Sequence, residues 1–156
     1  MMKENKRGEK LCLFFASDYH FEMISLPYIN KSLKENQNVI VMTENNLDSS
    51  IDKVLSRINL DEEEKDRLTK IDWKSDNLSK FKELKNFNNE GKDTLIFVKG
   101  KENYIENMNK NIENWINSNN IKVVDCYDIN EIHDEVSNIA KKYDKILSTS
   151  GIEKLL

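Results

Sequence analysis

The sequence has few of the residues that build cross-links, tight loops or metal sites. Its 156 residues include two cysteines, two histidines, four glycines and one proline. Cys12 and Cys126 are far apart, and a disulfide scaffold or a zinc site needs more ligands at closer spacing. We therefore expect two buried free thiols, which behave as small apolar core residues, and neither a metal site nor a cofactor.

Long hydrophobic runs and signal-peptide features are also missing. Every apolar run is much shorter than the roughly 20 residues that cross a bilayer. Met1–Gly8 is charged and has no apolar stretch, so we interpret it as a flexible leader and not as a signal peptide. These features predict a soluble, cytoplasmic protein without a membrane partner.

The scarcity of glycine matters most in the segment after the first apolar run, Phe15–His20. A phosphate-binding P-loop needs glycines for close backbone approach and a lysine for the outer phosphate oxygens, and a dinucleotide fingerprint needs glycines too. Phe15–His20 contains neither glycine nor lysine, so NTP hydrolysis is not expected. The formal net charge of −4, with no basic face evident, argues against direct nucleic-acid binding.

What the chain does contain is an alternation of short apolar runs and helix-length segments. The predicted strands are Lys10–Ala16, Asn38–Met42, Lys70–Trp73, Thr94–Lys99 and Lys122–Cys126, and Asp144–Ser148 is either a final strand or a tail. The first predicted helix begins at Ser17 or Asp18 and ends near Glu35. Another is capped by Ser75 or Asn77 and ends at Glu90, and the remaining ones cover Leu47–Arg57, Asp61–Leu68, Asn103–Ser118 and Asn130–Lys142. Pro27 lies inside the first helix and predicts a kink or a break near Ser25–Leu26, because proline lacks an amide donor.

Strands that alternate with helices in this way predict an α/β protein. The expected architecture is a three-layer, mostly parallel open sheet of five or six strands, with helices on both faces. We expect a single domain over residues 9–156. The first two predicted strands are joined by a helix-length crossover, which predicts that they form a parallel pair.

In open α/β sheets, ligands bind at the carboxyl ends of the strands. The polar and aromatic residues that follow the predicted strands are Ser17, Asp18, His20, Thr43, Glu44, Trp73, Lys99 and Tyr127. A mostly apolar, aromatic-lined pocket suits a small organic ligand, and core packing explains the aromatic residues equally well. His20 is either a proton donor or ligand to a bound molecule, or an ordinary, partly exposed helical histidine.

Several short motifs occur in the order found in a known family. These motifs are Gly8–Phe15, Leu26–Ile29, Asn38–Glu44, Asp72–Trp73, Phe97–Gly100 and Cys126–Asp128. Over roughly Gly8 to Gly151, the chain resembles the MEDS domain, the methanogen/methylotroph DcmR sensory domain, which is similar to KaiC- and RecA-like ATPases that lack the P-loop. The resemblance implies a degenerate RecA-like fold and a sensory, ligand-binding module in signal transduction, with small hydrocarbon derivatives as ligands. It gives weight to Cys12, Phe15, Thr43, Glu44 and Tyr127. Lys10 stands where the family usually has a histidine.

Three functions are consistent with these features. The first is a non-enzymatic regulatory module, without catalytic residues, that binds a small organic ligand or a signalling protein at the strand carboxyl ends. The second is a degenerate RecA-like protein that still binds nucleotide without hydrolysing it. The third is a small enzyme that uses His20 with Asp18 or Glu44. Pairing into a homodimer is compatible with all three.

Overall fold

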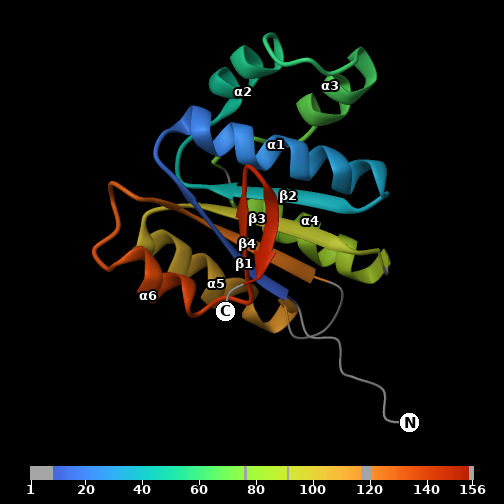
Figure 1. Ribbon diagram of the computed structural model, residues 1–156. Coiled ribbons are helices and arrows are strands. Elements are labelled where there is room, and N and C mark those ends of the chain that lie inside the picture. Colours follow the sequence, from blue (N-terminus) through green and yellow to red (C-terminus); the bar gives the residue numbers. More distant parts are fainter. Residues whose placement is uncertain (1–8, 76, 91, 117–120, 155–156) are drawn as a thin grey trace.

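The computed structural model describes residues 9–75, 77–90, 92–116 and 121–154, so the predicted leader Met1–Gly8 lies outside the described residues. Within them, six strands form one sheet in the order β2-β3-β4-β1-β5-β6 (Figure 1). The strands are β1 (Glu9–Phe15), β2 (Asn38–Thr43), β3 (Thr94–Gly100), β4 (Ile121–Asp128), β5 (Lys145–Ser148) and β6 (Gly151–Lys154). All neighbours pair in parallel except β5 and β6, which pair antiparallel. The predicted α/β class with a mostly parallel sheet is confirmed.

The strands form where the sequence has continuous apolar runs, because strands of a parallel sheet are buried on both faces. Leu95 to Val98 of β3 have at most 1% of their surface exposed. β1 pairs with β4 and β5, whereas β2 pairs with β3. The first two strands are therefore parallel but not neighbours, and the prediction that they pair directly is wrong. A crossover helix fixes the direction of the next strand but not how many strands the connection passes.

Helices cover both faces of the sheet. They are α1 (Asp18–Lys34), α2 (Asp48–Leu55), α3 (Glu62–Thr69), α4 (Asn77–Glu90), α5 (Glu102–Ile116) and α6 (Val136–Ala140). Figure 1 shows α1, α2 and α3 on one side of the sheet and α4, α5 and α6 on the other, which confirms the three layers. Along β1, Leu11 and Leu13 face the first side and Cys12 faces the second, as strand alternation requires. Among the helices that the structure describes, none is both long and apolar enough to cross a membrane.

The first helix begins as predicted but does not break. Ser17 is its N-cap, and its side chain accepts a hydrogen bond from the backbone N–H of His20. Pro27 lies inside α1, which continues to Lys34 without interruption. The proline removes one intrahelical hydrogen bond. Burial of neighbouring residues such as Leu26 and Ile29 in the core holds the helix together around it.

Two other predicted elements differ from the structure. Lys70–Trp73 is not a strand: Trp73 is buried, and its Nε1 donates a hydrogen bond to the carbonyl of Leu68 at 2.9 Å. Trp73 is therefore a core residue under α2 and α3, not a strand-end site residue. The predicted helix Asn130–Lys142 is reduced to α6, which has five residues. The chain also gains β6, which begins directly after a turn at residues 149–150; its first residue, Gly151, has φ +105°.

Candidate functional site

The carboxyl ends of β1 and β4 lie at a topological switch point. β1 leads into α1 on one face of the sheet, whereas its neighbour β4 leads into α6 on the other face. The structure brings three predicted residues together at this edge: Lys99, Asp18 and Phe15. Lys99 Nζ lies 3.1 Å from Asp18 Oδ1 and 4.9 Å from the centre of the Phe15 ring. The Lys99 side chain is only 7% exposed, so its ammonium is held between a carboxylate and aromatic rings.

The neighbouring residues Ser17 and His20 stabilise the start of α1. The backbone N–H of His20 donates to Ser17 Oγ at 3.1 Å, and His20 Nδ1 accepts a hydrogen bond from the backbone N–H of Ala16 at 2.9 Å. Both side chains are therefore used to fix the turn between β1 and α1. Among the described contacts, none joins His20 to the carboxylate of Asp18 or Glu44, the partners that an acid–base pair would need.

Thr43 and Glu44 fix the turn after β2. Thr43 is fully buried and donates from Oγ1 to the carbonyl of Asn45 at 2.8 Å. Glu44 Oε1 accepts from the backbone N–H of Lys101 at 2.9 Å and thereby ties β2 to the end of β3. A side chain at Gly100 would place its Cβ 2.9 Å from the same carboxylate oxygen, so glycine permits this close approach.

The sequence did not indicate Glu22, which lies on the inner side of α1 close to Asp18 and Lys99. Glu22 is 2% exposed, and its Oε2 has no hydrogen-bond partner among the described residues. Burial raises the pKa of Glu22 and the nearby Asp18 carboxylate adds to the rise, while a hydrogen bond from Ser50 and the charge of Lys99 oppose it. The strand-end region thus contains a buried acid and a buried lysine on the α1 side of the sheet.

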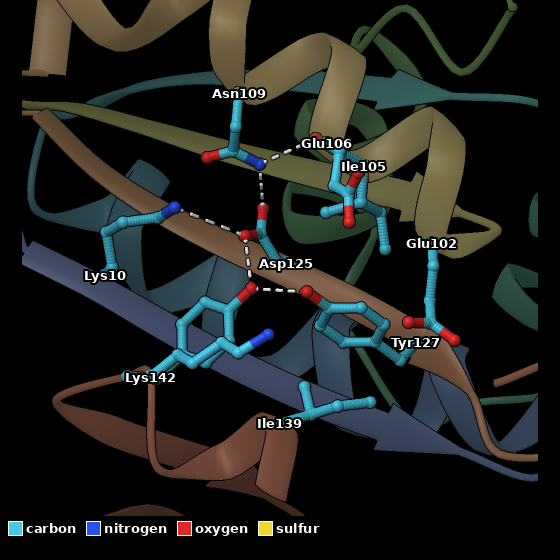
Figure 2. A pocket seen from close by; sticks show the side chains of 10 residues that line it. Lys10, Glu102, Ile105, Glu106, Asn109, Asp125, Tyr127, Ile139 and Lys142 are labelled. Carbon is cyan, nitrogen blue, oxygen red and sulfur yellow. Dashed lines mark hydrogen bonds and ion pairs between the residues drawn. The ribbon is translucent and has the colours of Figure 1, made fainter. Parts of the chain in front are cut away.

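A pocket lies on the opposite face of the sheet, between β4, α5 and the segment that follows α6 (Figure 2). Its volume is about 160 Å³. Lys10 of β1 and Asp125 of β4 contribute to its floor, and Asn109 of α5 and Ile139 of α6 contribute to its walls. Tyr127, which the sequence predicts as a site residue, also lines this pocket.

A chain of hydrogen bonds runs along the pocket through Asp125, whose surface is entirely buried. Asn109 Nδ2 donates to Asp125 Oδ1 at 3.0 Å, and the Tyr143 hydroxyl donates to Asp125 Oδ2 at 2.7 Å. Lys10 Nζ lies 3.6 Å from the same Oδ2. The hydroxyl oxygens of Tyr143 and Tyr127 are 2.5 Å apart. Three donors therefore converge on one carboxylate, and the two phenols extend the chain toward the end of β4.

Burial dominates the protonation of this network. It raises the pKa of Asp125, and the positive charge of Lys10 together with hydrogen bonds from Asn109 and Tyr143 opposes the rise. Burial also raises the pKa of both phenols, Tyr127 and Tyr143, and the charge of Asp125 adds to this effect. Both hydroxyls are accordingly protonated at neutral pH and can act as hydrogen-bond donors.

Comparison of the chain with protein-family models, with curated proteins and with solved structures found no match, so the resemblance to the MEDS family stays a prediction. Among the described residues, no group of three or more His, Cys, Asp or Glu side chains is placed to hold a metal ion. Sequence reasoning missed Asp125, Tyr143 and Asn109. One signal was available: Asp125 is an acid in the middle of an otherwise apolar run, where a charge is costly to bury.

Proposed function

We propose that the protein is a non-enzymatic sensory or regulatory module in signal transduction, and that it binds a small organic ligand in the pocket beside Asp125. The observation that carries this proposal is the buried Asp125 network. An acid buried in the middle of a central strand costs stability unless it is well paired. Here three donors orient it next to a cavity, which is the arrangement expected of a preorganised binding site.

The size of the pocket limits the ligand. A water molecule takes about 30 Å³ in the liquid, so 160 Å³ corresponds to about five waters, and an apolar cavity of about 150 Å³ can hold benzene. Sites for drug-sized ligands have roughly 300–1,000 Å³. A ligand about the size of a small aromatic ring fits this pocket, which supports a small metabolite or hydrocarbon derivative over a nucleotide.

Two further features support a sensory role. Tyr127, to which the MEDS resemblance gives weight, lines the pocket, and so does Lys10, which stands where that family usually has a histidine. The polar groups deepest in the pocket hydrogen-bond to one another, and such a fixed network suits recognition of a ligand. A cytoplasmic location belongs to the same proposal and is supported by the buried, unpaired thiols of Cys12 and Cys126.

The alternative of nucleotide binding rests on the other site, at the end of β1. The buried ammonium of Lys99 is the group there that could bind a phosphate. It already pairs with Asp18, so a phosphate would have to displace that carboxylate. Titration of the protein with ATP and Mg²⁺ by calorimetry tests this alternative, and a Lys99→Met variant is the control.

A fragment screen tests the proposal directly. Amide resonances of isotope-labelled protein are recorded with molecules about the size of a small aromatic ring, the size that the pocket volume allows. We expect hits whose shifts cluster on the pocket residues and disappear in Glu106→Trp, because the indole would cover the rim of the pocket. Glu113→Trp, on the same helix but outside the pocket, should keep them. Hits that survive Glu106→Trp would contradict the assignment of this site.

A further inference from the structure

We propose that the pocket selects a small organic cation, a primary ammonium on a short apolar or aromatic body, over a neutral or anionic molecule of the same size. This inference rests on the proposed function and adds the chemical class of the ligand. It follows from three properties of the pocket: which hydrogen-bonding groups are already used, which charges are left without a partner, and what the remaining walls are made of.

The hydroxyl donors inside the pocket are already used. Tyr143 has one hydroxyl proton, which it donates to Asp125 Oδ2. The short contact between the two phenols must therefore use the proton of Tyr127, with the Tyr143 oxygen as acceptor. Tyr127 is left with lone pairs and no proton to offer. A molecule that reaches this hydroxyl has to bring a donor.

The amide of Asn109 is fixed in the same sense. Its Nδ2 donates to the carbonyl of Ile105 at 2.8 Å and to Asp125 Oδ1 at 3.0 Å. A flipped amide would set its oxygen against two acceptors, so the orientation is determined by its partners. Asn109 Oδ1 then turns away from both and is buried without a hydrogen-bond partner among the described residues.

The charges at the rim favour a cation. Asp125 and Lys10 form an ion pair and compensate each other. That leaves two carboxylates on α5, Glu102 and Glu106, against one ammonium, Lys142, and hence one excess negative charge. Glu102 Oε1 accepts from the backbone N–H of His133 at 2.6 Å, which holds this carboxylate in place. Its other oxygen and both oxygens of Glu106 have no donor among the described residues.

The remaining walls suit the body of such a ligand. Ile105 and Ile139 supply apolar surface on either side of the Tyr127 ring. Tyr143, which also lines the pocket, already faces a cation, because Lys10 Nζ lies 5.5 Å from the centre of its ring. An ammonium placed between the tyrosines and Glu102 would combine this attraction with charge-assisted hydrogen bonds.

Three molecules of matched shape test the inference: benzylamine, benzyl alcohol and benzoate. Each is titrated into the labelled 156-residue chain at neutral pH while amide resonances are recorded. We expect benzylammonium to shift the pocket residues and to bind about tenfold more tightly than benzyl alcohol, with benzoate weakest. The preference for benzylammonium should disappear in the double variant Glu102→Gln/Glu106→Gln. It should persist in Glu113→Gln, which removes one negative charge from α5 outside the pocket.

Each other result has a defined meaning. If benzyl alcohol or benzoate shifts the same residues at the same or lower concentration, the ligand is not a cation, whereas binding in the pocket, and with it the proposed function, stands. If the double variant keeps the wild-type preference, the two carboxylates do not select the ligand and the inference fails. If none of the three probes shifts the pocket residues, the inference and the proposed function both fail.

Discussion

Replacing Tyr143 with phenylalanine removes one oxygen atom from the buried network and nothing else. That oxygen donates to Asp125 Oδ2 at 2.7 Å and accepts from Tyr127, 2.5 Å away. We expect Tyr143→Phe to destabilise the fold measurably, although the ring keeps its place and its contacts. The reason is that a fully buried carboxylate loses one of its three donors and a neighbouring phenol loses its acceptor.

The expected size follows from these two losses. A hydrogen bond to a charged group contributes about 1.5–3 kcal/mol. Tyr127 is 7% exposed, so its unpaired hydroxyl adds to the loss unless a water molecule from the adjoining pocket replaces the missing acceptor. We therefore expect the free energy of unfolding to fall by about 2–3 kcal/mol. For a chain of this length the melting temperature should drop by about 4–12 °C, at roughly 2–4 °C per kcal/mol.

Urea denaturation followed by circular dichroism measures this loss. Tyr19→Phe is the matched control, since Tyr19 is 61% exposed and should change stability by less than about 0.5 kcal/mol. The double variant Asp125→Asn/Tyr143→Phe should lose less than the sum of the two single changes, because both act on the same hydrogen bond. A Tyr143→Phe protein within about 0.5 kcal/mol of wild type would show that the network does not support the fold in this way.

Two further predictions concern charged pairs outside the pocket. Lys99→Met should keep or raise the free energy of unfolding, because methionine fills the same apolar space and Asp18 is largely solvated. Asp18→Ala should lower the free energy of unfolding by about 1–2 kcal/mol, since the buried ammonium of Lys99 loses its carboxylate partner. Urea titrations of both variants measure these changes. A Lys99→Met protein that is less stable than the Asp18→Ala protein would contradict the prediction. Lys34 and Asn30 hold the pKa of Glu64 at about 2, below the ordinary 4.5, so its ionised form stabilises the fold above pH 4.5 and this contribution is lost as the pH falls through 2. Melting curves should therefore show Glu64→Gln less stable than wild type near neutral pH and similar to it near pH 2, and a difference independent of pH would be evidence against this pair.

The α/β class and most of the elements could be predicted because their apolar runs are long and their burial is nearly complete. The failures occur where the pattern is short. Lys70–Trp73 offers only two apolar residues in alternation, and the indole of Trp73 finds a carbonyl partner in the core instead. The helical spacing after Asp128 is overridden by carboxylates: Asp128 accepts from the backbone N–H of Asn130, and Glu102 accepts from that of His133. These amides are then not available for helical hydrogen bonds.

The candidate site was only partly predictable, since the position rule for open sheets looks at strand ends. That rule predicted Tyr127, Lys99 and Asp18 as site residues. It passed over Asp125, which lies in the middle of β4 beside Cys12 of β1. The partners of Asp125 come from elements far apart in the sequence, and only the folded arrangement of β1, α5 and the segment before β5 brings them together.

The position of β4 determines which parts of the molecule can adjust when a ligand occupies the pocket. This strand is bonded along both of its edges, to β3 over Ile121–Tyr127 and to β1 over Lys122–Asp128. Its backbone is thereby immobilised, and structural adjustment falls on segments with fewer buried contacts. The five-residue α6, whose Val136 is 40% exposed, is such a segment. Structural adjustment to an occupied cavity is accordingly expected around α6, while the sheet beneath keeps its geometry.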